Sequence, residues 1–178
     1  IKKAVYSDHE IFLRELVSNA VDAISKRRMA SMAGDCDNCE EPQVKITIDR
    51  EKNILKISDN GIGMNDEEIK KYINQVAFSS AEEFLTKYKK DNDEFIGHFG
   101  LGFYSSFMVA DKVNILTKSA IGDSKTFNWS CDGSHNFTLE ESERESAGTD
   151  VIVNLMDEEK EFIEPERIKS LINKYCDC

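Results

Sequence analysis

The amino-acid sequence predicts an α+β fold, a two-layer α/β sandwich in which helices cover one face of a mostly antiparallel sheet. Three observations support this prediction. The chain has 178 residues, a length typical of one domain, so residues 1–178 are expected to form a single unit. A long helical pattern comes first, and six short apolar runs typical of strands follow it in two groups. Because helices and strands do not alternate one by one, a parallel βαβ sheet is disfavoured.

The helices are predicted from apolar residues at helical spacing and from residues that cap helix ends. The longest is expected over residues 8–32, after a possible N-cap at Ser7 or Asp8. Asn65 is a possible N-cap of a second helix over about 66–74. The other expected helices are residues 79–89, an apolar segment that starts in the glycine cluster 97–102 and runs to about Ala110, and a last helix from Pro165 to about Tyr175.

The strands are predicted from short runs rich in β-branched and aromatic residues. Residues 44–48 and 54–57 are joined by a short polar turn, so we expect them to form an antiparallel hairpin. The remaining strands are expected over residues 112–117, 125–130, 136–139 and 149–155.

The chain is strongly acidic, with 23 basic and 34 acidic residues and a net charge of −11. Such a charge repels phosphate backbones, so nucleic-acid binding is disfavoured. In residues 1–33, six basic and four acidic residues give +2, which leaves −13 for the rest, so we expect an anionic ligand to bind near this segment. No apolar run approaches the ~18 residues of a membrane helix, and no secretory signal is visible. Because the chain begins at Ile1, we expect it to be part of a longer protein.

The five cysteines are odd in number, which disfavours a framework of disulfides and favours a reducing cytosol. Cys36 and Cys39 could join Cys176 and Cys178 as four thiolate ligands of zinc. The second pair has one residue between its cysteines, which is a poor spacing for zinc. Reduced thiols on mobile segments are the favoured interpretation.

A polar stripe runs along the first predicted helix, where Glu15, Asn19, Asp22 and Lys26 are spaced four, three and four residues apart. One interpretation is a solvated face. The other is the lining of a cavity, favoured because apolar residues cover most of the remaining circumference. A carboxylate one turn from a carboxamide can hold water and a hard cation, and Mg²⁺ prefers oxygen ligands.

Two glycine-rich segments are candidate ligand sites. In residues 59–63, which read DNGIG, an aspartate ends a strand and two glycines let a flat ligand approach; its carboxylate could accept a hydrogen bond from the amine of adenine. The cluster 97–102 precedes a predicted helix, so its backbone N–H groups could bind an anion. It matches neither a P-loop nor a Rossmann turn. Residues 148–150 begin a strand and alone indicate little.

Together these motifs resemble the Bergerat (GHKL) ATP-binding fold of gyrases, mismatch-repair ATPases, sensor histidine kinases and a chaperone family. The resemblance is most detailed to the ninety-kilodalton heat-shock protein family, especially its bacterial form, and it covers nearly the whole chain. The segments that carry it are FLRELVSNAVDA (12–23), DNGIGM (59–64), IGHFGLGFYS (96–105), VADKV (109–113) and the closing RIK (167–169) with KY (174–175).

The resemblance implies a role for each matching residue. Glu15 would be the general base that activates water at the γ-phosphate, and Asn19 would coordinate Mg²⁺. Asp59 would bind the adenine amine, directly and through water, and Thr149 would share that water network. Residues 72–96 would form a lid over the nucleotide. The other implied nucleotide-binding residues are Gly63 and Met64 at the adenine, Gly100, Leu101, Gly102 and Phe103 through backbone N–H groups at the phosphates, Lys26 toward the ribose and phosphates, and Asp22, Ala23, Ile62 and Gly97.

The lid departs from the family pattern. Relatives read close to GTIAKSG where residues 74–80 read NQVAFSS, so we expect a lid that favours its open state.

The resemblance implies the N-terminal nucleotide-binding domain of a cytoplasmic, ATP-dependent chaperone. It would bind Mg²⁺ with ATP or ADP and hydrolyse ATP slowly, because a middle domain supplies an arginine to the γ-phosphate. The longer protein would be a homodimer that acts on unfolded client proteins with possible co-chaperones, whereas this chain alone would be monomeric. The alternatives are an ATP-sensing module without hydrolysis, a mismatch-repair or topoisomerase ATPase, and a purely structural interaction protein.

Overall fold

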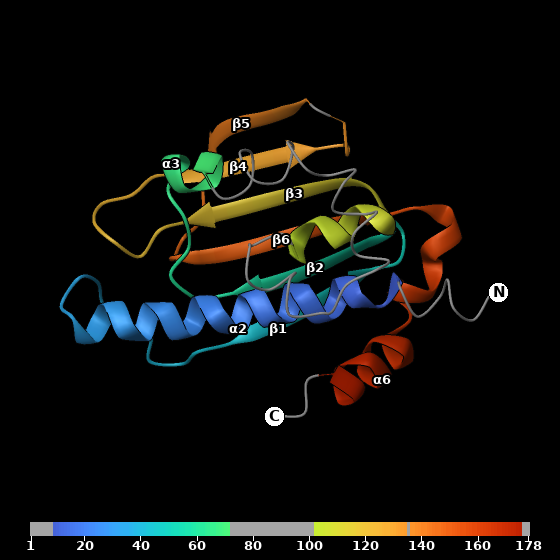
Figure 1. The fold of residues 1–178 in the computed structure, drawn as a ribbon, viewed down its shortest axis with the longest axis horizontal. Helices are drawn as coiled ribbons and strands as arrows, with labels where there is room; N and C mark the ends of the chain where they lie inside the picture. The colour runs from blue at the N-terminus through green and yellow to red at the C-terminus, as the bar shows by residue number, and fades with distance from the viewer. Residues whose placement is uncertain (1–8, 72–101, 135, 176–178) are drawn as a thin grey trace.

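The computed structural model describes residues 9–71, 102–134 and 136–175 (Figure 1). They contain a six-stranded sheet of order β1-β2-β6-β3-β4-β5, in which every neighbouring pair is antiparallel. The α+β class with an antiparallel sheet is therefore confirmed. The strands are β1 (Val44–Asp49), β2 (Ile54–Asp59), β3 (Ala110–Lys118), β4 (Thr126–Cys131), β5 (Phe137–Ser142) and β6 (Gly148–Leu155).

The predicted strands all form, with ends that differ by a few residues. The hairpin of β1 and β2 is antiparallel as expected. The last strand, β6, inserts between β2 and β3, so strands from the two halves of the chain become neighbours at the centre of the sheet. This long-range pairing positions the candidate site described below.

The long helix α2 (Ile11–Met32), blue in Figure 1, lies along the sheet and contacts β2, β1 and β6. It begins later than predicted. Glu10, the residue before it, has helical dihedral angles, and its side chain makes no capping hydrogen bond. Ser7 and Asp8 lie outside the described residues. The other helical elements are α3 (Asp66–Ile69), the 3-10 helices η2 (Gly102–Met108) and η3 (Asp157–Ile163), and α6 (Pro165–Tyr175).

The starts of two other helices, which the sequence predicted, are present. The side chain of Asn65 accepts a hydrogen bond from the backbone N–H of Glu68, and the Glu68 side chain accepts one from the N–H of Asn65. This reciprocal capping box starts α3. The last helix begins at Pro165 and ends at Tyr175, as predicted. The predicted helix 79–89 and the expected lid 72–96 lie outside the described residues.

The helix predicted to run to about Ala110 is wrong in type and in its end. Within the described residues it is a 3-10 helix that ends at Met108, and Ala110 already belongs to β3. The N–H of Val109 donates to the carbonyl oxygen of Ser106, a tight turn, while the Val109 carbonyl oxygen accepts a hydrogen bond from Met156 beside the sheet. The hydrogen bond with Met156 ends the helix and directs the chain into the sheet. The apolar pattern alone could not indicate this long-range contact. The sequence also missed η3.

The hydrophobic core lies between α2 and one face of the sheet. Phe12 of α2 is fully buried and packs edge-on against Phe162 of η3, with ring centroids 5.0 Å apart. Along β2 the buried side chains alternate as Leu55, Ile57 and Asp59. Since alternate residues of a strand share one face, Asp59 stands at the end of an apolar row that faces the helix layer.

Within the described part of the chain, no helix is both long and apolar enough to span a membrane.

Candidate functional site

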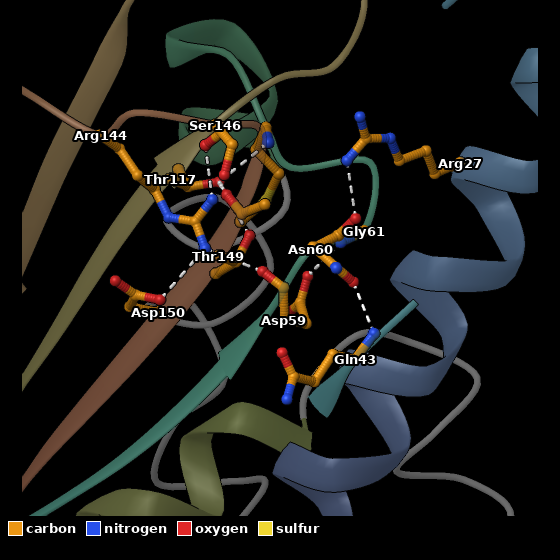
Figure 2. Close-up of polar contacts among 12 residues, drawn as sticks. Arg27, Gln43, Asp59, Asn60, Gly61, Thr117, Arg144, Ser146, Thr149 and Asp150 are labelled. Carbon is orange, nitrogen blue, oxygen red and sulfur yellow. Dashed lines mark hydrogen bonds and ion pairs between the residues drawn. The ribbon is translucent and has the colours of Figure 1, made fainter. Parts of the chain in front are cut away.

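Three polar side chains form a row across the centre of the sheet. Asp59 at the end of β2 pairs with Thr149 of β6, and Thr149 pairs with Thr117 of β3. All three side chains are polar and buried, and each continues a row of mostly apolar side chains along its strand. Figure 2 shows them facing one another from three strands. The insertion of β6 between β2 and β3 therefore brings together residues that are 90 positions apart in the case of Asp59 and Thr149.

Asp59 is only 6% exposed, and its surroundings compensate the negative charge of the carboxylate only in part. Its Oδ1 accepts a hydrogen bond from the backbone N–H of Gly61 at 2.8 Å. Burial raises the pKa of Asp59 from 3.8 to about 6, although backbone hydrogen bonds from Gly61 and Thr149 and the charge of Arg144 act in the opposite direction. A buried carboxylate that is still ionised at neutral pH is a strong acceptor for an N–H group of a ligand.

The turn after Asp59 is held close to α2 and to the loop that follows β3. The N–H of Ile62 donates to the carbonyl oxygen of Ala23 at 2.9 Å, and the Ile62 carbonyl oxygen accepts from Ala120 at 2.7 Å. A Cβ on Gly61 would lie 2.5 Å from the backbone of Ala23. Gly63 has φ of +65°, and a Cβ there would lie 1.9 Å from the carbonyl oxygen of Lys118. Both glycines are therefore required by this turn.

Two polar side chains that the sequence analysis did not select also brace this turn. Arg27 of α2 donates from Nη1 to the carbonyl oxygen of Asn60 at 2.8 Å. The Asn60 side chain accepts from the N–H of Gln43 and donates to the carbonyl oxygen of Glu41, both at 2.7 Å. These contacts tie the acidic loop after α2 to the end of β2 (Figure 2).

Thr117 is the central polar group that sequence reasoning missed. Its Oγ1 accepts from the N–H of Met64 at 3.0 Å and lies 2.9 Å from Oγ1 of Thr149 and 3.2 Å from the carbonyl oxygen of Gly148. A hydroxyl has one proton, so Thr117 donates to one of the last two groups at a time. If Thr117 donates to Gly148, Thr149 donates to Thr117 and retains lone pairs for a ligand. One sequence signal could have identified Thr117. It lies two residues after Ile115 in a predicted strand, so its side chain is expected on the same buried face of the sheet.

The structure divides the polar stripe of α2 into a buried end and an exposed end. Glu15 is buried, and its Oε1 lies 3.0 Å from Nη2 of Arg14. Asn19, Asp22 and Lys26 are exposed, and the last two form an ion pair of 2.8 Å with each other. The expected enclosure of the stripe therefore holds for Glu15 alone, because the apolar packing of α2 ends one turn further along.

The structure brings four of the other expected residues to the turn after β2. Ala23, Ile62, Gly63 and Met64 lie in or against the turn after β2. The backbones of Gly102 and Phe103 begin η2, which packs against α2. Gly97, Gly100 and Leu101 lie outside the described residues.

The zinc alternative gains no support from the described residues, in which no group of three or more His, Cys, Asp or Glu side chains could hold a metal ion. Cys36, Cys39 and Cys131 are unpaired thiols. Cys176 and Cys178 lie outside the described residues. Asn19 is exposed and lies one helical turn from Glu15, and its side-chain amide oxygen is the type of ligand that Mg²⁺ prefers.

A family model and several known proteins match this chain. Residues 6–160 match the family model described as histidine kinase-, DNA gyrase B- and HSP90-like ATPase. The chain is 49% identical over 177 residues to "Chaperone protein HtpG" of Porphyromonas gingivalis and 52% identical over 176 residues to that of Bacteroides thetaiotaomicron, which covers 99% of this chain in both cases. It is 43% identical over 183 residues to that of Pseudoalteromonas translucida. The chain spans about a quarter of the length of these relatives, 26% of the first two and 28% of the third.

Proposed function

We propose a nucleotide-dependent function from one premise: the chain belongs to the family of histidine kinase-, DNA gyrase B- and HSP90-like ATPases. In this proposal the chain is the domain that binds ATP and ADP and hydrolyses ATP slowly. We propose that the longer protein is an ATP-dependent chaperone, because its relatives are named chaperones and its family is one of ATPases.

The observation that carries the proposal is the row of Asp59, Thr149 and Thr117. The Asp59 carboxylate accepts hydrogen bonds from the backbone N–H groups of Gly61 and Thr149, and its two oxygens keep further lone pairs for a ligand N–H. The exocyclic amine of adenine supplies such a donor. Guanine presents a carbonyl oxygen at the equivalent position, and two acceptors repel each other, so the site favours adenine nucleotides. The Thr149 hydroxyl, oriented by Thr117, supports a water-mediated contact to the same base.

The catalytic assignment concerns the start of α2. Glu15 is the proposed general base, held at the edge of the core by the packing of its helix. Asn19, one turn further along, is the proposed magnesium ligand and would hold the ion against the phosphates through its amide oxygen. The bound ion supplies positive charge that neutralises the phosphates. The role of this chain's residues is to place Glu15 beside that centre and to hold the water for attack.

The phosphate contacts are assigned to Lys26 and to backbone N–H groups. Lys26 is a cation that can exchange its ion pair with Asp22 for a phosphate oxygen, because both side chains are exposed. Backbone N–H groups at the start of η2 are the second proposed source of phosphate contacts. The proposed remaining phosphate ligands are Gly97, Gly100 and Leu101, together with Gly102 and Phe103.

The function of the longer protein is a further part of the proposal. Slow hydrolysis fits a domain that spans about a quarter of its relatives, with other segments contributing to the reaction. Unfolded client proteins, co-chaperones, a homodimeric state and a cytoplasmic location are proposed for that protein. The unpaired thiols of Cys36, Cys39 and Cys131 support a reducing compartment.

One observation favours a second candidate function, nucleotide sensing without hydrolysis. The guanidinium of Arg14 lies 3.0 Å from Glu15, and an ion-paired carboxylate is a weaker base than a free one. In that case the wild type would bind ATP and ADP but would not hydrolyse ATP.

Calorimetric titration of the chain with ADP, ATP and GTP, each with and without Mg²⁺, tests the proposal. We expect ADP and ATP to bind and GTP to bind at least tenfold more weakly, because an unmatched buried acceptor costs ~1–3 kcal/mol. Asp59→Asn should lose most of the affinity for ADP, while Asp35→Asn, on the exposed loop after α2, should retain it. Wild-type affinity in a folded Asp59→Asn variant would remove the assignment of the adenine site.

A further inference from the structure

Arg144, in the loop between β5 and β6, joins three segments at one point. Its Nη2 donates to the backbone carbonyl oxygen of Asp59 at 2.9 Å and lies 3.3 Å from Oδ1 of Asp150 on β6. Its Nη1 donates to the carbonyl oxygen of Ser146 at 2.6 Å. Figure 2 shows the guanidinium between the start of β6 and the end of β2. One planar group therefore links the loop, β6 and β2 beside the proposed adenine contact.

This link is enclosed by the fold. The side chains of Arg144 and Asp150 are 14% and 16% exposed, so their ion pair is shielded from water far more than an ordinary surface pair. Gly148 makes the approach possible, because a Cβ there would lie 2.1 Å from the carbonyl oxygen of Asp59 and 2.7 Å from Nη1 of Arg144. Any larger residue at position 148 would separate the guanidinium from β2.

We propose that Arg144 is a positioning residue for the nucleotide site, which holds the ends of β2 and β6 together so that the Asp59 carboxylate and the Thr149 hydroxyl stand in fixed places for the base. The proposal rests on the proposed function of Asp59. Arg144 does not touch the nucleotide in this account and acts only through the two strands. A guanidinium suits this task because it presents several donors in a rigid plane, whereas an ammonium group cannot hold three acceptors in that geometry.

The charged groups around Asp59 support the same role. Arg144 faces Asp59 from the loop before β6, and its positive charge lowers the pKa of Asp59. The negative charge of Asp150 on β6 raises that pKa. On the side of α2, Arg27 binds the carbonyl oxygen of the adjacent Asn60. Within the part of the chain that the structure describes, Arg144 is therefore the cation that acts directly on Asp59, and it opposes the effect of burial on the pKa of that carboxyl.

The test compares Arg144→Ala and Arg144→Lys with Arg50→Ala, which removes an exposed arginine from an ion pair with Glu164. ADP affinity is measured by calorimetry from about pH 5 to about pH 8, and the pKa of Asp59 is followed by carboxyl-carbon NMR without nucleotide. We expect Arg144→Ala to lower ADP affinity at pH 7 by roughly tenfold or more, because an Asp59 carboxylate that is no longer held in place would lose its hydrogen bond with the base, a hydrogen bond to a charged group. It should also move the midpoint of the binding profile to higher pH.

The conservative variant separates charge from geometry. Arg144→Lys should keep the pH midpoint near that of the wild type and still bind ADP more weakly at pH 8, and Arg50→Ala should match the wild type throughout. A residue that merely stabilised the loop would lower the melting temperature without moving the midpoint or the pKa of Asp59. If Arg144→Ala is folded and neither value moves, the inference is overturned. If Arg144→Ala does not fold, wild-type binding by Arg144→Lys at every pH overturns it.

The two proposals fail in different ways. Unchanged ADP affinity in Asp59→Asn would remove the proposed function of Asp59, whatever the Arg144 variants do. Loss of binding in Asp59→Asn together with wild-type binding in both Arg144 variants would remove only the positioning role.

Discussion

Replacing Asp59 with asparagine is expected to stabilise the nucleotide-free domain at neutral pH, although it removes the proposed adenine contact. The carboxylate is buried, and desolvation raises its pKa from 3.8 to about 6. At pH 7 the folded domain therefore contains a charge that its surroundings compensate only in part. Asparagine has nearly the same shape, keeps an oxygen for the N–H of Gly61, and never ionises.

The direction of the pH dependence follows from the raised pKa. Between pH 3.8 and about 6 the folded carboxyl keeps its proton while the unfolded one has lost it, so the free energy of unfolding falls as the pH rises through this range. Below the range both states are protonated and the cost disappears. At ~1.4 kcal/mol per pH unit, the full cost above pH 6 is roughly 3 kcal/mol. Because asparagine also loses one acceptor, we expect a net gain of about 1–3 kcal/mol at pH 7.

Urea denaturation of the wild type and Asp59→Asn at about pH 4 and about pH 7.5 measures this difference. The two proteins should have similar free energies of unfolding at the lower pH, and the variant should be more stable at the higher pH. Asp35→Asn is the control, because its side chain is exposed and the same substitution there should have little effect at either pH. A variant that is less stable than the wild type at both pH values would refute the reasoning.

Three further substitutions test the site. Glu15→Ala should leave ADP binding unchanged and slow single-turnover ATP hydrolysis by ~10²–10⁴-fold, the usual effect of losing a general base. Thr117→Val should reduce the free energy of unfolding in urea by about 1–3 kcal/mol, because the N–H of Met64 loses its acceptor in a buried place, and should also weaken ADP binding in calorimetry. Gly63→Ala should prevent the turn from forming, with loss of ADP binding and a large fall in melting temperature, because its Cβ would meet the Lys118 carbonyl oxygen.

The glycine and threonine substitutions each have a matched control. Gly34→Ala places the same residue at a positive φ of +84° in open space, so it should cost only ~1 kcal/mol. Thr47→Val, on the exposed face of β1, should be nearly neutral. Equal melting temperatures for the two glycine variants would contradict the close approach at position 63. Wild-type turnover in Glu15→Ala would point to a different base, whereas no hydrolysis by the wild type itself would favour the nucleotide-sensing alternative.

Local patterns were sufficient to predict much of this fold. Strands such as β1 and β2 were predicted because their apolar residues alternate over a few positions and a polar turn joins them. The start of α3 was predicted because Asn65 and Glu68 interact within one helical turn. The end of η2 at Met108, before the predicted end near Ala110, was not predicted, because Val109 leaves the helix to pair with Met156, a contact that local periodicity does not encode.

The candidate site shows the same division. Glu15, Asn19 and Asp59 were selected from the sequence because their chemical types and spacings resemble a known family. The sequence alone did not select Thr117 or Arg144, since both are ordinary polar residues until the fold places them.

The sequence by itself determined most helices and strands, their amphipathic faces and the chemistry of single residues. These features depend on neighbours within a few positions. What only the tertiary structure decided is the order of the sheet. The insertion of β6 between β2 and β3 sets Asp59 beside Thr149 and Thr149 beside Thr117, and it brings Arg144 to the end of β2. Burial then gives the Asp59 carboxyl its raised pKa, a property of the surrounding protein rather than of an aspartate in a turn.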